Sequence, residues 1–321
     1  MYFTYERPRF DVNDPEEIRR VIREAYQNGL ESAKNGGGKA ADYIPELAKA
    51  DPDDFGICVR GIDGEMIAFG ETEKRFSIQS ISKVINLAAA LKFFGFRETF
   101  SHVQMEPSGD DFNSILKLDT VSDLPFNPMI NAGAIQVAGM LSNLMDFEEL
   151  MGFARAFCMD DGITLNEAVY RSEAETGDRN RAIAYLLKSK GILQGEPNRA
   201  LDLYFRMCSL NVNAKSLAGL GLILANRGEN PFTGKHMVHP GYVRTVRSLM
   251  YTCGLYNESG AFGVLVGIPA KSGVGGGITA AVSGRWGIGT YGPALNEKGN
   301  SVGGVAALQH MSHLLRLNVF D

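Results

Sequence analysis

The motif Ser80-Ile-Ser-Lys83 holds a pair of residues that could carry out acyl transfer. Residues three apart on a helix share a face, so the lysine amine would lie beside the serine hydroxyl. If Ser80 opens the apolar run 81–94, its oxygen lies at the positive end of the helix dipole. Burial would lower the pKa of Lys83, because the charged form loses its hydration. A neutral Lys83 could then take the proton of Ser80 as a general base.

A second motif, Lys271-Ser-Gly273, follows an apolar stretch on the C-terminal side. Serine acyl transferases with an S-x-x-K motif carry a K-T-G motif in the same order. Backbone N–H groups of a strand here could join that of Ser80 in an oxyanion hole. We also expect the charge of Lys271 to help lower the pKa of Lys83 by like-charge repulsion.

Alternatives remain open for both motifs. Ser114 and Lys117 repeat the S-x-x-K spacing, so the motif alone is not specific. Ser80 could simply cap a helix while Lys83 extends to solvent, and Lys271 could be an exposed lysine on a hairpin. The glycine run at 273–277 is not followed by a βαβ unit, which argues against a dinucleotide-binding loop.

Two polar segments could bind a small ligand. Asn131 stands at the start of an apolar helix, and residues 172–180 pack charges and amides into a turn expected between two helices. Capping is the simplest interpretation of both segments. Amides, tyrosines and a carboxylate would also suit a small zwitterion, whose ammonium pairs with the carboxylate.

The elements that must position these residues follow from the hydrophobic pattern. Residues 13–29 predict a helix that ends at Gly29, and residues 55–70 predict a β-hairpin. Short strands are expected at 262–268, 276–282 and 288–291, before a last helix at about 303–316. The middle of the chain predicts helices near 133–145, 147–158, 179–190, 200–209, 214–227 and 240–252.

This order predicts an α+β fold, in which an antiparallel sheet is built from both chain ends and flanked by helices. An all-helical block is inserted between the two halves of the sheet. We expect one domain, 1–321. Its mixed sheet–helix part is 25–80 with 253–321, its helical part is 81–252, and 1–24 is a helical N-terminal extension.

Composition narrows the classes of function. The chain has 321 residues, and its net charge of −5 argues against nucleic acid as a partner. No apolar run is long enough for a membrane span, and the first residues lack a signal-peptide core, so a cytoplasmic protein is expected. The cysteines have no metal-binding spacing, so we expect no metal and reduced thiols at Cys58, Cys158, Cys208 and Cys253.

Taken together, these segments resemble the serine-dependent glutaminases, a family with a β-lactamase/transpeptidase-like fold. The resemblance covers about residues 25 to 315. It is carried by ADYIPELA (41–48), QSISK (79–83), EPSG (106–109), NPMINAGA (127–134), EAETGDRN (173–180), YFRMCS (204–209), PAKSGVGGG (269–277) and GNSVG (299–303).

The resemblance implies hydrolysis of L-glutamine to L-glutamate and ammonia through a serine acyl-enzyme, without a cofactor. It also implies a homodimer or homotetramer. It makes Ser80 the nucleophile, Lys83 its base and Tyr256 a proton-transfer residue. The N–H groups of Ser80 and Val274 would form the oxyanion hole. The other substrate contacts that it implies are Tyr43, Asn131, Glu173 (facing the α-ammonium), Asn180 and Tyr204.

Two other functions stay open at this point. A penicillin-interacting serine hydrolase would carry the same two motifs. A catalytically silent amino-acid-binding protein would keep the pocket without turnover.

Overall fold

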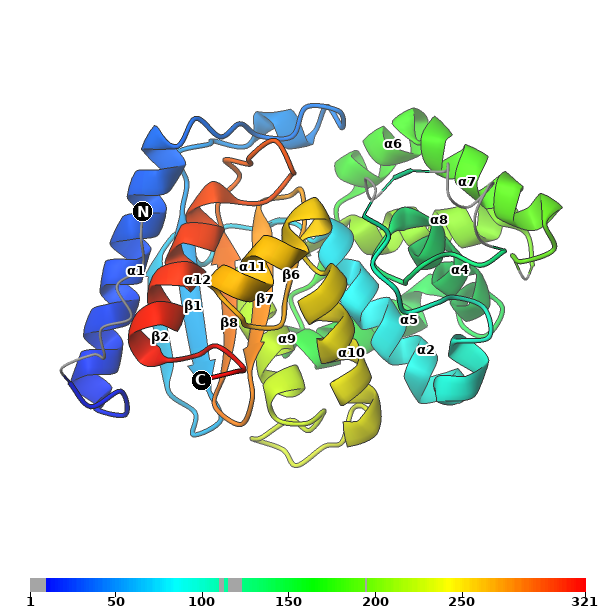
Figure 1. Ribbon diagram of the computed structural model, residues 1–321. Coiled ribbons are helices and arrows are strands. Elements are labelled where there is room, and N and C mark those ends of the chain that lie inside the picture. Colours follow the sequence, from blue (N-terminus) through cyan, green and yellow to red (C-terminus); the bar gives the residue numbers. More distant parts are fainter. Residues whose placement is uncertain (1–9, 110–112, 115–122, 194) are drawn as a thin grey trace.

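The computed structural model describes residues 10–109, 113–114, 123–193 and 195–321. Strands from both ends of the chain form one antiparallel sheet in the order β2-β1-β8-β7-β6 (Figure 1), which confirms the expected sheet. Strand β1 pairs with β8 so that Val59 lies opposite Ile288. The strands are β1 (Gly56–Gly61), β2 (Met66–Gly70), β6 (Ala270–Ser272), β7 (Gly277–Val282) and β8 (Trp286–Tyr291).

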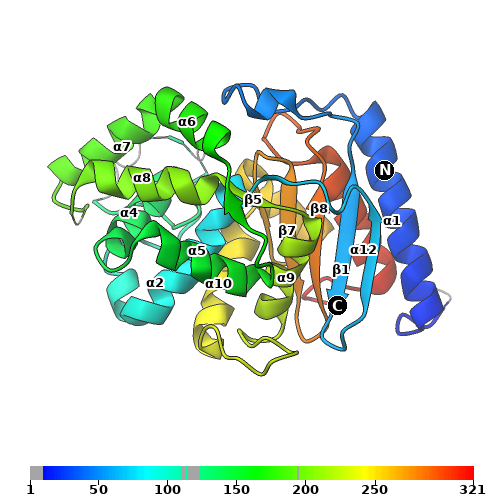
Figure 2. The same cartoon turned by 180° about the vertical axis from the view of Figure 1, so that it is seen from behind.

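Helices cover both faces of the sheet. Helices α1 (Pro15–Asn35) and α12 (Val302–Leu315) pack against each other over one face, and α9 (Ala214–Ala225) lies on the other (Figure 2). Two glycines of β8 allow α9 to approach closely. A Cβ at Gly287 would lie 2.0 Å from the backbone nitrogen of Leu222, and one at Gly289 would lie 2.0 Å from the Ala214 carbonyl oxygen. Because β8 has no side chains at these two positions, helix α9 can lie directly on the sheet.

The helical block that was expected in the middle of the chain is confirmed, but it is not all-helical, because two short strands, Thr164–Leu165 and Leu210–Val212, fall within 81–252. Its central helix is buried on every side from Ser82 to Leu91, because α4, α5 and α10 surround it. A small sheet in the order β3-β5-β4 borders the block. The helices are α2 (Ser82–Thr99), α4 (Asn131–Ser142), α5 (Phe147–Cys158), α6 (Glu167–Thr176), α7 (Asp178–Ser189), α8 (Pro197–Cys208) and α10 (Pro240–Cys253). The strands are β3 (Phe76–Ser77), β4 (Thr164–Leu165) and β5 (Leu210–Val212).

The strand expected at 262–268 is wrong. Most of this segment belongs to helix α11 (Ser259–Leu265), and the strand before the glycine run is β6. The hydroxyl oxygen of Ser259 accepts the N–H of Leu255 over 3.0 Å, which steadies the start of this helix. Its apolar side chains do not alternate as in a strand: Phe262 is buried, whereas Val264 is 78% exposed. A short helix with one buried side fits this pattern.

A further expectation about a helix end is wrong. The first helix does not stop at Gly29 but continues to Asn35. A Cβ at Gly29 would lie 2.2 Å from the Phe55 ring, so this glycine serves close packing rather than termination. The turn expected between two helices at 172–180 is confined to Gly177, where α6 ends and α7 begins. Within the described residues, the structure has no helix with the length and apolar character of a membrane span.

Candidate active site

Ser80 lies in a single 3₁₀ turn, η2 (Gln79–Ile81), that leads from β3 into helix α2. The preceding residue, Gln79, has φ = 51°, a left-handed conformation that is uncommon for a side-chain-bearing residue. The turn after β6 passes close to this segment. A Cβ at Gly273 would lie 2.7 Å from the Ile78 carbonyl oxygen, and one at Gly275 would lie 2.2 Å from that of Ser77. The glycines therefore bring the two expected motifs together.

Lys83 is the second residue of α2, one turn after Ser80, and is 1% exposed. Its Nζ donates hydrogen bonds to Oδ1 of Asn131 over 2.7 Å and to the Met129 carbonyl oxygen over 3.2 Å. Burial lowers its pKa to about 8, while Cys208 and Glu173 act in the opposite direction. A fraction of Lys83 is therefore neutral near neutral pH and can accept a proton.

The expectation for Lys271 needs a correction. Its side chain is fully buried, and Nζ donates to the carbonyl oxygens of Gly254 over 2.9 Å and Ser272 over 2.7 Å. Burial is the largest cause of the lowered pKa of Lys83. The like-charge repulsion acts on Lys271 instead: burial lowers the pKa of Lys271 most, and the charge of Lys83 lowers it further. Lys271 is also not the exposed lysine of the alternative interpretation.

Tyr256 opens the 3₁₀ turn η3 (Tyr256–Glu258) with φ = 50°. Burial raises the pKa of its hydroxyl, and hydrogen bonding to Ser80, Ser272 and the backbone of Val274 partly offsets this rise. The hydroxyl thus lies beside the proposed nucleophile and one proposed oxyanion donor. The Nζ of Lys271 lies 4.3 Å from the centre of the Tyr256 ring, within the range of a cation–π contact.

A cavity of about 100 Å³ brings together six of the residues that the resemblance implies. Its small volume suits a metabolite rather than a polymer. Asn131 opens α4, Glu173 and Asn180 come from α6 and α7, and Tyr204 comes from α8. Tyr43 lies at its rim with 53% of its surface exposed. The lining residues are Tyr43, Ile44, Gln79, Ser80, Asn113, Asn131, Glu173, Thr176, Gly177, Arg179, Asn180 and Tyr204.

Glu173 supplies the carboxylate of this cavity. The side chain is 6% exposed, and its Oε2 accepts a hydrogen bond from Nε2 of Gln79 over 3.5 Å. Burial raises its pKa to about 8, although Gln79 and the charge of Lys83 act to lower it. A ligand ammonium beside this carboxylate would stabilise its charged form. Nearby, Nδ2 of Asn131 donates to Oδ1 of Asn180 over 3.0 Å.

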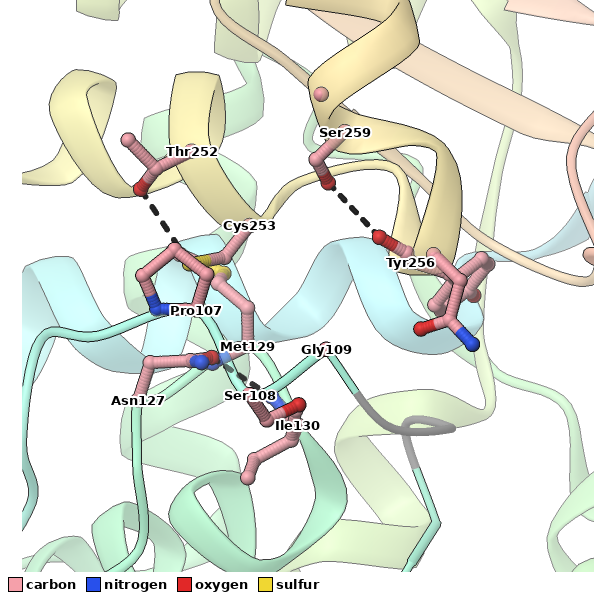
Figure 3. A pocket seen from close by; sticks show the side chains of 12 residues that line it. Pro107, Ser108, Gly109, Asn127, Met129, Ile130, Thr252, Cys253, Tyr256 and Ser259 are labelled. Atoms are coloured by element: carbon pink, nitrogen blue, oxygen red, sulfur yellow. Dashed lines mark hydrogen bonds between the residues drawn. The ribbon is translucent and has the colours of Figure 1, made fainter.

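Two further cavities adjoin the site. Figure 3 shows one between residues 107–109 and Tyr256, with Tyr256 and Ser259 on the side of η3 and α11. The other is lined by Tyr43, Tyr256, Val274 and the turn at 295–299. Tyr256 lines both of these cavities, and Tyr43 lines the second one as well as the cavity at Ser80. Tyr43 and Tyr256 therefore lie at the boundaries between neighbouring cavities.

Sequence reasoning missed Gln79 and Asn300. Gln79 touches Glu173, and only its position beside Ser80 hints at a role. Asn300 accepts a hydrogen bond from Ser272 and was noted only as part of the GNSVG segment. Lys117 of the competing pair Ser114 and Lys117 lies outside the described residues. In the described part of the chain, no three residues among His, Cys, Asp and Glu are grouped to hold a metal ion.

Known proteins share this architecture. A family model described as Glutaminase matches residues 38–320. The protein named Glutaminase 2 from Clostridium perfringens (strain 13 / Type A) is 50% identical over 287 residues, which cover 88% of this chain and 94% of that protein. A glutaminase from Clostridioides difficile (strain 630) is 49% identical over 288 residues, or 88% of this chain and 93% of its own length.

Solved structures agree with these relatives. A structure described as probable glutaminase ybaS superposes with a TM-score of 0.91 at 35% identity, covering 96% of this chain and 99% of its own. Another is the covalent complex of the Bacillus subtilis glutaminase YbgJ with 5-oxo-L-norleucine, formed by reaction with 6-diazo-5-oxo-L-norleucine. It has a TM-score of 0.84 at 36% identity and covers 96% of this chain and all of its own (100%).

Proposed function

The chain belongs to the glutaminase family, and we propose that it hydrolyses the side-chain amide of L-glutamine with Ser80 as the nucleophile. The activity follows from the family and from relatives that carry this name at about half identity. The observation that supports the assignment of the nucleophile is the placement of Ser80 at the cavity, one turn from Lys83, whose pKa burial lowers to about 8.

Acylation begins when neutral Lys83 takes the proton of Ser80. The freed oxygen attacks the amide carbon, and the carbonyl oxygen gains the negative charge. The backbone N–H groups of Ser80 and Val274 are the proposed donors to this oxyanion. The C–N bond then breaks, and the nitrogen leaves as ammonia after Tyr256 passes it a proton. Water attacks the γ-glutamyl ester by the reverse proton path, which releases L-glutamate and restores Ser80.

Recognition of the substrate rests on the opposite wall of the cavity. Glu173 faces the α-ammonium, because a buried carboxylate binds best to a group that compensates its charge. Asn131, Asn180 and Tyr204 offer amide and phenol groups to the α-carboxylate, and Tyr43 closes the rim. A ligand that carries an ammonium and a carboxylate on one carbon would pair with Glu173 and, at the same time, with these amide and phenol groups.

A covalent adduct on a relative supports a nucleophilic mechanism over a silent binding protein. The B. subtilis glutaminase reacts with 6-diazo-5-oxo-L-norleucine, a glutamine-like compound, and keeps 5-oxo-L-norleucine attached. The penicillin-interacting alternative shares the two motifs but has no comparable support from the relatives. Hydrolysis of a chromogenic β-lactam, without release of ammonia from L-glutamine, would favour that alternative.

The direct test is ammonia release from L-glutamine by the purified wild type and Ser80→Ala. We expect release by the wild type alone, with both proteins folded. Release by Ser80→Ala at the wild-type rate would overturn the assignment of Ser80.

The proposal also covers the domain organisation, the oligomeric state and the cellular location of the protein. We propose a single domain over 1–321, since β1 pairs with β8 across the whole inserted block. A homodimer or homotetramer is implied by the family resemblance, and light scattering on the eluted protein tests it. Free thiols at all four cysteines support a cytoplasmic location, because such thiols persist in reducing compartments.

A further inference from the structure

A buried hydrogen-bonded chain leads from the carboxylate of Glu258 toward the hydroxyl of Tyr256. Nδ2 of Asn300 donates to Oε2 of Glu258 over 2.5 Å, and Oδ1 of Asn300 accepts from Oγ of Ser272 over 2.6 Å. Ser272 and Asn300 are both fully buried. Hydrogen bonding to Ser272 is one of the interactions that lower the pKa of Tyr256 against the effect of burial.

The carboxylate sets the direction of the hydrogen bonds along this chain. A carboxylate can only accept, so the amide nitrogen of Asn300 turns toward Glu258 and the amide oxygen toward Ser272. The single proton of Ser272 is then directed at Asn300, since its contact with the Gly254 carbonyl oxygen is longer, at 3.4 Å. These two hydrogen bonds of Asn300 fix its amide between Glu258 and Ser272.

Glu258 also fixes the backbone that carries Tyr256. Its Oε2 accepts from Nδ2 of Asn296 over 2.9 Å, which ties η3 to the turn at 296–300. This turn packs on the tyrosine: a Cβ at Gly299 would lie 3.6 Å from the Tyr256 ring. Nδ2 of Asn300 donates in addition to the Leu255 carbonyl oxygen over 3.2 Å, directly before η3. The same side chains thus hold both the ring and the backbone that carries it.

We propose that Glu258 is a positioning residue for the reaction and holds Tyr256 in place through its hydrogen bonds with Asn300 and Asn296. The inference rests on the proton-transfer role proposed for Tyr256. Glu258 is absent from the described residues that line the three cavities of the site, so a direct contact with substrate is not part of its role.

The first test compares three variants in steady-state hydrolysis of L-glutamine. Glu258→Ala should lower kcat about tenfold and leave KM within about twofold, because the chain acts on the proton transfer rather than on binding. Glu258→Gln keeps an accepting oxygen and should restore kcat to within about twofold of the wild type. Glu31→Ala removes an exposed carboxylate of α1 that is not among the described residues lining the three cavities, and it should leave both constants unchanged.

A double-mutant cycle then separates the proposed coupling of Glu258 to Tyr256 from a general loss of stability. Asn300→Ala removes the side chain that links Glu258 to the Leu255 carbonyl oxygen, so adding Glu258→Ala to it should cause no further fall in kcat. Melting temperatures are measured alongside, and Glu258→Asp, too short to reach Asn300, replaces Glu258→Ala if the latter does not fold. An unchanged kcat in the Glu258 variant would overturn the proposed coupling. So would a double variant in which the two losses of kcat multiply. Full activity of Tyr256→Phe would instead overturn the role proposed for the tyrosine.

Discussion

The ammonium of Lys83 donates a hydrogen bond to Oδ1 of Asn131 over 2.7 Å, and Asn131 passes one on to Asn180 over 3.0 Å. Both asparagines line the cavity. The amide of Asn131 thus connects the proposed base to the wall that is proposed to bind the substrate. A change at this residue should therefore alter proton transfer and binding together.

Asn131→Asp tests this connection. A carboxylate in place of the amide would favour the charged form of Lys83 and raise its pKa from about 8. We expect the acidic limb of the kcat profile to move about one pH unit upward. Asn180→Asp, one residue farther along the chain, should move it less. Equal shifts, or no shift in Asn131→Asp, would disconnect Asn131 from the base.

The wild-type pH profile tests the two titrating groups of the site. The free enzyme needs Lys83 neutral and Glu173 ionised, and burial places the pKa of each at about 8. We expect kcat/KM to rise steeply from pH 6 and to level off above about pH 8, where both groups have lost their protons. The profile is measured at constant ionic strength. A flat profile between pH 6 and 9 would contradict the assignment.

Glu173→Gln should weaken substrate binding and stabilise the fold at alkaline pH. The pKa of Glu173 is raised in the folded protein, so its ionisation lowers the free energy of unfolding as the pH rises from its ordinary value toward 8. At pH 8.5 the neutral amide should stabilise the fold by about 1–2 kcal/mol, a rise of a few degrees in Tm. At pH 5 the gain should disappear.

Kinetics of the same variant supply the other half of this prediction. Loss of the charge opposite the α-ammonium should raise KM for L-glutamine about 100-fold. A gain in Tm that is equal at both pH values would show that charge is not its cause. An unchanged KM would remove Glu173 from substrate recognition.

Tyr256→Phe tests the proton delivered to the leaving group. The variant lacks only the hydroxyl, and we expect kcat for L-glutamine to fall about 10²–10³-fold. A γ-glutamyl p-nitroanilide has a leaving group that depends less on protonation, so its loss should be much smaller. Equal losses on both substrates would assign the tyrosine to positioning rather than to proton transfer.

Local patterns in the sequence predicted the parts of the site that lie close together along the chain. Ser80 and Lys83 lie one turn apart where η2 leads into α2, and glycines near Lys271 mark the turn that approaches them. The contact of Gln79 with Glu173 joins residues 94 positions apart, and no local spacing encodes it. The helix α11 was mistaken for a strand because a seven-residue apolar run fits either element.

The family resemblance, rather than spacing, supplied Tyr43, Tyr204 and Tyr256. Single tyrosines carry no sequence signal of their own. The structure brings each of them to a cavity at Ser80 or beside it, through loops and helices that fold back from distant positions. Neither the local spacing nor the family resemblance singled out Glu258 and Asn300. These residues bond to each other and are absent from the described residues that line the cavities of the site.

Labelling with 6-diazo-5-oxo-L-norleucine tests the central claim, that Ser80 is the nucleophile, most directly. The wild type is treated, digested and analysed by mass spectrometry, with Ser80→Ala and the buried neighbour Ser82→Ala as matched variants. We predict one adduct on Ser80 in the wild type and in Ser82→Ala, and none in Ser80→Ala. An adduct on another residue, or an unlabelled Ser80 in enzyme that the compound has inactivated, would contradict the account.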